Sequence, residues 1–394
     1  MGTSANNMTP AQINGIARSM VSAQSVRMVQ QIFNATVVPA NQPFLNVIPR
    51  NVGLIMGFWV KVVATITNPQ ADEVDLVPSD FGVANLLTQI QFTDLNNNVR
   101  IQTPGWHINF INSVKARFQY AASLLTSTMD GNAGIVGEYG ANWPVIVQPA
   151  SIPDESSAVC TMWYYIPLAY SDGDYRGAIY ANVVNATMQL ALTFNQHPSQ
   201  LTSGDTTTAC YVGATVGASV ISTATVTVYQ DYLDQLPFGK TGPILPNLDL
   251  STVYDIKQTI FTGITQAQDF PMQYPNFRDF LSTFCVYNNG AGAASRLGGG
   301  DVAYFALQSA NFTNLWKLEP ALIALRTRGL MHMDFPFGVY YFGSRNKPIS
   351  TSQYGNMELV LNASSSVTGA YALVGWESFA LVNLLTQAGS LPAS

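Results

Sequence analysis

The sequence predicts an all-β protein of the sandwich or jelly-roll type, built as two successive halves. Short segments rich in β-branched and aromatic residues recur after residue 50, and turn pairs such as Asn68-Pro69 and Asp172-Gly173 separate them. Segment 236–246 holds three prolines and two glycines in eleven residues, a composition that neither a helix interior nor a central strand tolerates. We therefore expect a linker there between two strand-rich units.

Before the first of these strands, the N-terminal segment predicts a helix over residues 10–33. Thr9 is a suitable N-cap, Pro10 fits the first helical position, and no further proline occurs before Pro39. Apolar residues recur along one side at helical spacing, beginning at Ile13 and Ile16. Such a helix either docks on its own protein or lies against an anionic surface, which would be a membrane or a nucleic acid.

The first half is expected to consist of five main strands and one helix. The strands are rich in Val, Ile, Thr, Tyr, Phe and Trp, the residues that favour a pleated and partly buried surface. We predict strands at 53–67, 86–93, 158–170, 187–194 and 222–233, and a helix at 107–125.

The second half repeats this pattern on a smaller scale. We predict its strands at 280–290, 301–313, 337–343, 356–363 and 368–382. A strand reading MQLAL (188–192) precedes the aromatic strand at the end of the first half, and one reading MELVL (357–361) precedes its counterpart in the second. We therefore expect these two strands to be structurally equivalent, although such short similarities also arise by chance.

Composition predicts that much of the surface is covered by other protein. Only 10% of the 394 residues are charged, while 47% are hydrophobic, and a typical globular domain carries about 25% charged residues. No run of about 18 apolar residues offers a membrane-spanning helix. The charge is also uneven: four cations precede the first acid, Asp72, although the whole chain carries −6.

The sequence offers little sign of catalysis, cofactors or metals. Its three cysteines, Cys160, Cys210 and Cys285, are far apart, which indicates buried thiols in a reducing compartment. The GKT triplet at 239–241 lacks the first glycine of a phosphate loop, since Asp234 stands there. Asp172 and Asp174 could bind Ca²⁺, but a solvated turn is the simpler interpretation.

Several segments, in order along nearly the whole chain after residue 50, resemble the double jelly-roll major capsid proteins of tectiviruses. These are icosahedral bacteriophages with an internal membrane. The segments are GFWVKVVATITN (57–68), SDFGVANL (79–86), GWHINF (105–110), YYIPLAYSDGD (164–174), YQDYLDQLPFGKTGPILPNLDLSTVY (229–254), DFPFGVYYF (334–342) and YGNMELVLN (354–362).

The resemblance implies two consecutive eight-stranded jelly rolls preceded by an amphipathic helix. It also implies a homotrimer of six rolls that tiles an icosahedral virion shell, with no enzymatic activity, cofactor or metal. The expected divisions are an arm at 1–49, a first jelly roll at 50–236, a linker at 237–249, a second jelly roll at 250–385 and a tail at 386–394.

In the family, the N-terminal helix lies against the internal membrane. The resemblance therefore implies membrane-facing positions at Ile13, Ile16, Arg18, Met20, Arg27 and Met28. The expected partners are the chain itself, neighbouring trimers, that membrane and vertex proteins, without sequence-specific nucleic-acid binding, and assembly takes place in the cytoplasm of a host bacterium. The alternative is a jelly-roll spike or lectin-like module, which would show a concave patch of aromatic and polar side chains instead of broad apolar sides.

Overall fold

A computed structural model gives the architecture of the chain. It describes residues 8–69, 74–115, 146–182, 187–196, 199–200, 207–213, 220–240, 242–290, 299–310, 312–331, 335–336, 338–343, 348–365 and 369–380. The predicted tail at 386–394 lies outside these ranges, and so does the part of the predicted helix 107–125 that follows residue 115.

The first half forms two facing antiparallel sheets. One has the order β1 (Val26–Val37), β12 (Val220–Asp234), β3 (Leu54–Asn68) and β7 (Ser156–Pro167). The other has the order β2 (Phe44–Val47), β9 (Gln189–Phe194), β5 (Leu87–Thr93) and β6 (Val99–Thr103). Alternate residues of β3, from Phe58 to Ile66, are fully buried between the sheets, as the two-residue period of a strand requires.

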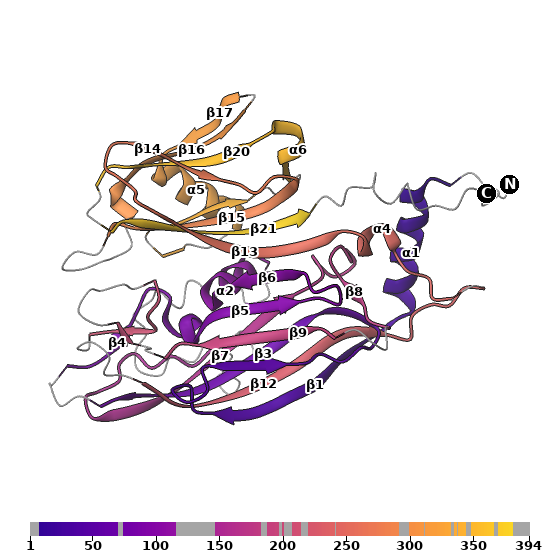
Figure 1. Cartoon of the computed structure of the whole chain (residues 1–394), viewed down its shortest axis with the longest axis horizontal. Helices are drawn as coiled ribbons and strands as arrows, with labels where there is room; N and C mark the ends of the chain where they lie inside the picture. The colour runs from indigo at the N-terminus through magenta and orange to yellow at the C-terminus, as the bar shows by residue number, and fades with distance from the viewer. Residues whose placement is uncertain are drawn as a thin grey trace.

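The second half repeats the arrangement. One set of strands has the order β13 (Val253–Thr262), β21 (Tyr371–Ala380), β15 (Arg278–Asn288) and β18 (Val339–Gly343). It continues the β2-β9-β5-β6 sheet of the first half, because β13 pairs with β6 in parallel. The other has the order β14 (Asp269–Gln273), β20 (Met357–Ala363), β16 (Val302–Ser309) and β17 (Phe312–Leu318). Figure 1 shows these two bodies of strands one above the other.

Both halves are jelly rolls with the same connectivity. Counting the eight strands of each half along the chain, the sheets read first-eighth-third-sixth and second-seventh-fourth-fifth in both. Strands β9 and β20 are both seventh, and β12 and β21 are both eighth. The equivalence predicted for the MQLAL and MELVL strands and for the aromatic strands that follow them is therefore confirmed.

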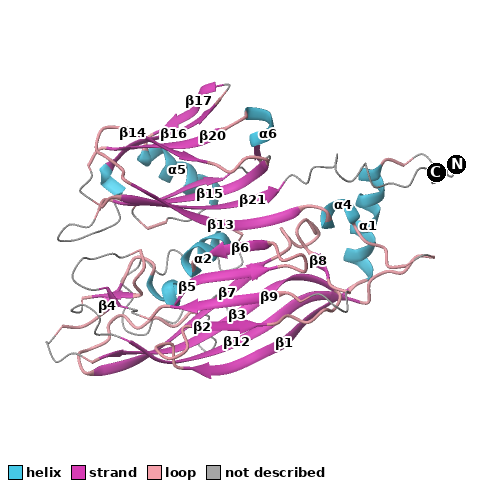
Figure 2. Ribbon diagram, in the orientation of Figure 1, coloured by secondary structure: helices cyan, strands magenta, loops and turns pink. Residues whose placement is uncertain are grey.

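The longer helices are α1 (Pro10–Gln24), α2 (Gly105–Val114) and α5 (Pro320–Met331). Shorter elements are β4 (Val77–Pro78), η2 (Gly82–Leu86), β8 (Ile179–Tyr180), β10 (Ser199–Gln200), β11 (Tyr211–Val212), α4 (Asn247–Leu250), η3 (Gly299–Asp301), β19 (Ile349–Ser350) and α6 (Thr351–Tyr354). Figure 2 shows α2 between the two strand bodies, and α1 and α4 together at one end of the molecule. No helix in the described ranges has the length and apolar character needed to cross a membrane.

The predicted N-terminal helix is right in its start and wrong in its end. Thr9 caps it through a reciprocal capping box with Gln12, and Pro10 is its first residue. It stops at Gln24, however, and residues 26–37 form β1, which pairs with β12 along its whole length. The boundary predicted between residues 49 and 50 is wrong for the same reason, because β1 and β2 are strands of the first jelly roll.

Candidate functional site

The contact between the two jelly rolls is built around helix α2. This helix follows β6 directly, and its residues from Gly105 to Ser113 are all buried. Two of its rings, His107 and Phe110, lie 5.5 and 5.7 Å from the ring of Phe284 in the second roll. Beside them, Gly375 leaves the necessary space, since a Cβ atom there would lie 2.6 Å from the His107 ring.

A buried ion pair closes one end of this contact. Lys115, which caps α2, places its Nζ atom 2.7 Å from Oε1 of the buried Glu377 on β21. Ser282 donates a hydrogen bond to the other carboxylate oxygen at 2.6 Å, and the Tyr254 hydroxyl also donates to Glu377. Burial raises the pKa of Glu377, but Lys115 and these donors outweigh it and hold the pKa below the ordinary glutamate value.

Helix α5 is the counterpart of α2 in the second roll. It starts two residues after β17, just as α2 starts two residues after β6. In this alignment Leu322 and Leu325 take the places of His107 and Phe110. Both leucines are exposed, at 46% and 65% of their surface. The second roll thus presents apolar side chains at the positions where the first roll contacts its neighbour.

The first roll has a counterpart of the surface that receives α2. Asp231 on β12 corresponds to Glu377 on β21, because each is a buried acid near the end of the eighth strand. In the first roll, Tyr229, Trp59 and Tyr165 lie side by side across β12, β3 and β7. Their counterparts in the second roll are Gly375, Phe284 and Tyr341, side by side across β21, β15 and β18.

No helix covers this face of the first roll in the described part of the chain. Trp59 and Tyr229 are only half-buried there. A hollow of about 340 Å³ lies on this face. It is lined by Arg27, Val29, Trp59, Tyr165, Asp172 and Asp231.

Arg27 belongs to this hollow. It donates to both carboxylate oxygens of Asp231, at 2.9 and 2.6 Å, and pairs with Asp172 at 3.0 Å. The hydrogen bonds to Asp231 raise the arginine pKa further above its ordinary value. Beside it, strand β1 is the edge of its sheet, and Met28 and Val29 are exposed at 42% and 56%. An exposed apolar edge strand is a surface that natural proteins normally cover.

Helix α1 is docked on the protein by a second set of ion pairs. Arg18 donates two hydrogen bonds of 2.6 Å to the buried Asp249 of α4 and contacts Asp174 at 3.3 Å. Asn14 adds a hydrogen bond of 2.8 Å to Asp249. The hydrogen bond to Asp249 raises the pKa of Arg18, so the arginine stays charged.

The residues predicted to face a membrane therefore separate into two groups. Ile13, Ile16, Arg18 and Met20 lie on α1, whereas Arg27 and Met28 lie on β1. Ile13 and Ile16 are exposed at 54% and 46%, while Ala17 and Val21 are buried against the protein. The two arginines bind aspartates of the chain itself.

The aspartates considered for Ca²⁺ are part of these ion pairs. Asp172 contacts Arg27, and Asp174 contacts Arg18 and Arg176. Burial raises the pKa of Asp174, but its hydrogen bonds to Arg176 outweigh this and lower it. Within the described ranges no group of three or more potential metal ligands occurs.

Sequence reasoning missed both α5 and the outer face of the first sheet. Pro320 at a helix start was the available signal for α5. For the sheet, the signal was the large aromatic residues at outward positions of predicted strands, such as Trp59 and Trp163.

Comparisons with known proteins agree with this architecture. The crystal structure of the STIV major capsid protein, from Sulfolobus turreted icosahedral virus, matches with a TM-score of 0.63 at 11% identity, covering 93% of this chain and 100% of that one. The PBCV-1 capsid protein VP54, in a structure fitted to the virophage Sputnik, matches with a TM-score of 0.55 at 11% identity, covering 90% and 94%. The fold is that of the double jelly-roll capsid proteins.

Sequence relationships define the family. Residues 7–236 match the profile of the P3 major capsid protein N-terminal domain, and residues 251–393 match that of the C-terminal domain. The major capsid protein P3 of Enterobacteria phage PRD1 is 38% identical over 377 residues, which cover 95% of this chain and 93% of the relative. The chain belongs to the P3 major capsid protein family. It is thus a structural component of a phage virion and no enzyme, and the spike or lectin-like alternative is not favoured.

Proposed function

We propose that three copies of this chain close into a ring of six jelly rolls, the building block of an icosahedral shell. The observation that supports this most directly is the repeated contact geometry. Within the chain, α2 of the first roll sits on the outer sheet face of the second roll. The second roll has a matching helix, α5, with exposed leucines, and the first roll has a matching sheet face that no helix covers among the described residues.

Repeating the same contact between copies places α5 of one chain on the outer face of the next chain's β1-β12-β3-β7 sheet. Leu322 and Leu325 then enter the hollow beside Trp59 and Tyr165. A ring in which one contact recurs at every junction closes after a whole number of chains. Three chains give six similar bodies, and a six-sided block tiles a flat facet.

The low charge content supports this assembly. A block packed on all sides against identical blocks needs few charged side chains on its flanks, and only 10% of the residues are charged. The partners proposed for this chain are therefore further copies of itself, neighbouring trimers and the proteins at the shell's vertices. Division of the chain into two rolls joined by the linker at 237–249 is part of the same proposal.

Native mass spectrometry of the purified chain at low micromolar concentration tests the ring. We expect a species of three chains, because an obligate interface of this kind buries more than roughly 2,000 Å² and does not dissociate at that concentration. A monomer under these conditions would contradict the proposal.

We further propose that α1 faces an internal membrane, and that the shell assembles around it in the host cytoplasm. The support is the exposed pair Ile13 and Ile16, together with the scarcity of acids near the N-terminus. In this proposal Arg18 holds the helix on the protein through Asp249, and the isoleucines enter the interfacial region of the bilayer. Each copy contributes little, but a shell of many copies binds by avidity.

The double variant Ile13→Asp with Ile16→Asp tests the membrane contact. We expect trimers that bind vesicles of anionic phospholipid at least about fivefold more weakly in a flotation assay, because two exposed apolar side chains become anions. The matched control is Val77→Asp, a change at another exposed apolar residue, which lies on β4. Equal flotation of the double variant and the parent would show that α1 only docks on protein. Arg18→Glu is unsuitable for this test, since the new carboxylate would face Asp249.

A further inference from the structure

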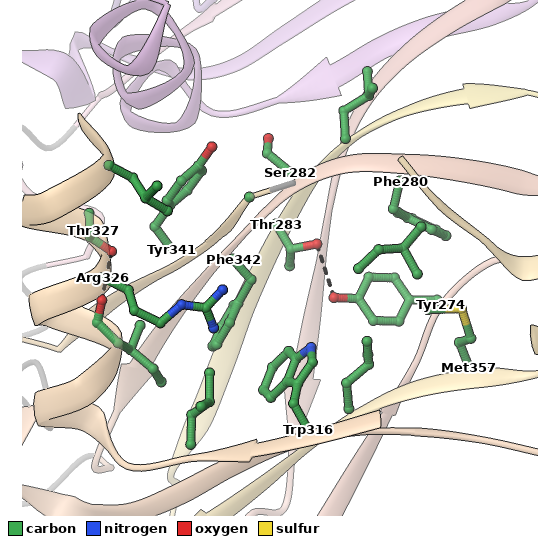
Figure 3. A pocket seen from close by; sticks show the side chains of 17 residues that line it. Tyr274, Phe280, Ser282, Thr283, Trp316, Arg326, Thr327, Tyr341, Phe342 and Met357 are labelled. Atoms are coloured by element: carbon green, nitrogen blue, oxygen red, sulfur yellow. Dashed lines mark hydrogen bonds between the residues drawn. The ribbon is translucent and has the colours of Figure 1, made fainter. Parts of the chain in front are cut away.

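A cavity of about 590 Å³ lies in the second jelly roll, between helix α5 and strands β15 and β17. Figure 3 shows its aromatic walls and the guanidinium of Arg326 directed into it beside Phe342. This volume is within the range of small-molecule sites, about 300–1,000 Å³. The lining residues are Tyr274, Phe280, Leu281, Ser282, Thr283, Leu307, Trp316, Leu318, Ile323, Arg326, Thr327, Leu330, Tyr341, Phe342, Gly343, Ile349 and Met357.

Two lining positions of the cavity differ from their counterparts in the first roll. Phe284 on β15 and Trp59 on β3 occupy equivalent positions in the two rolls. The residues just before them therefore correspond as well, and Thr283 stands where the first roll has Phe58. Phe58 is fully buried, with its ring 5.5 Å from Phe92. On the helices, Arg326 takes the place of the buried Ile111. A threonine thus stands where the first roll has a buried phenylalanine, which leaves space, and an exposed arginine stands where the first roll has a buried isoleucine.

The charged groups that line the cavity are of one sign. It contains a single cation, Arg326, and no carboxylate. The walls are apolar, with Trp316 stacked on Phe342 at 5.2 Å.

Most of its other polar groups already have partners inside the protein. The Tyr274 hydroxyl bonds to Thr283 at 3.0 Å, Ser282 donates to Glu377, and Thr327 donates to the Ile323 carbonyl. No ion pair is found for Arg326 among the residues that the structure describes. Arg326 is itself exposed, so its guanidinium is accessible to an anion from solvent, next to an apolar space.

We propose that this cavity binds an unbranched long-chain carboxylate, with the acid group on Arg326 and the chain between the walls formed by Tyr274, Leu307 and Met357. The lining face of α5, which includes Ile323 and Leu330, would then pack on the bound chain. The adjacent face, with Leu322 and Leu325, stays available for the contact between copies. Binding in the cavity does not depend on the ring of three chains.

Isothermal titration calorimetry of the purified full chain with decanoate tests the site. We expect saturable binding of one molecule per chain, and about tenfold weaker binding of decan-1-ol, which lacks the anion. Arg326→Gln should weaken decanoate binding about tenfold and leave decan-1-ol unchanged. Arg328→Gln, a change at another cation of α5 outside the lining, is the matched control and should bind decanoate as the parent does.

A second variant tests the position of the chain. Thr283→Phe restores the filling used in the first roll and should abolish binding of both compounds. If that variant fails to fold, the comparison of Arg326→Gln with Arg328→Gln still decides. The proposal is overturned if decanoate shows no saturable binding to the parent, if Arg326→Gln binds it as tightly as the parent does, or if folded Thr283→Phe still binds it.

Discussion

Leu325→Asp is expected to leave the chain folded but to abolish the trimer. Leu325 is 65% exposed in the single chain, so an aspartate there meets water and costs little folding free energy. In the proposed ring the same side chain enters the hollow beside Trp59 and the acids Asp172 and Asp231. A new carboxylate would be desolvated there and repelled by these acids.

The expected loss is roughly 3 kcal/mol or more at each of the contacts between copies, because an unpaired charge is buried in every one. Native mass spectrometry should show monomers at concentrations where the parent is trimeric, while circular dichroism shows the parent's strand content. Val77→Asp, which changes an exposed valine on neither surface, should remain trimeric. Trimers of Leu325→Asp as stable as the parent's would place the interface elsewhere.

Lys115→Met is expected to be among the most destabilising single changes in the chain. It removes the ammonium group 2.7 Å from Glu377, whose side chain is 4% exposed, and leaves that carboxylate buried without its cation. Removing one partner of a buried ion pair costs about 3–5 kcal/mol of unfolding free energy. Differential scanning calorimetry should show a clear fall in Tm.

The double variant Lys115→Met with Glu377→Gln should recover most of this loss, because no unpaired charge then remains. The control is Lys317→Met, since Lys317 lies over Tyr304 on the exposed surface and should change Tm little. An unchanged Tm for Lys115→Met would show that the pair contributes nothing to the contact between the rolls.

The same cluster gives the contact a definite pH dependence. Because the pKa of Glu377 is lower in the folded chain than its ordinary value of 4.5, the ionised carboxylate stabilises the fold above that value. This contribution is lost as the pH falls through the lowered pKa, when the folded state must also take up the proton. His107 adds to this dependence. Burial lowers its pKa to about 3, so the folded ring stays neutral while the unfolded ring takes up a proton below its ordinary value of 6.5, and stability falls as the pH drops from about 6.5 toward 3.

Strand positions could be predicted from sequence because burial of one strand face in a two-sheet core requires apolar residues at alternate positions. Strand β3 alternates between buried and half-buried residues along most of its length, and the prediction of 53–67 differs from the observed Leu54–Asn68 by one residue at each end. Segment 26–37 shows no such alternation of buried residues. As an edge strand it is mostly exposed, and its apolar residues also fit a helix, so only pairing with β12 decides its conformation.

The sequence by itself thus determined the fold class and the two-part organisation, because strand alternation and turn chemistry are local properties of the chain. The family came from the resemblance of whole segments such as 57–68 and 354–362. Tertiary structure alone decided which side chains form ion pairs and which apolar side chains lie on the surface. Arg18 and Arg27 look like free cations in the sequence, but folding brings them to Asp249 and Asp231, more than two hundred residues away. Likewise, Leu322 and Trp59 are ordinary apolar residues until the strand order places one on the outer side of a helix and the other on the outer face of a sheet. The physical reason is that ion pairs and exposed faces depend on contacts between distant segments, which no local pattern of residues encodes.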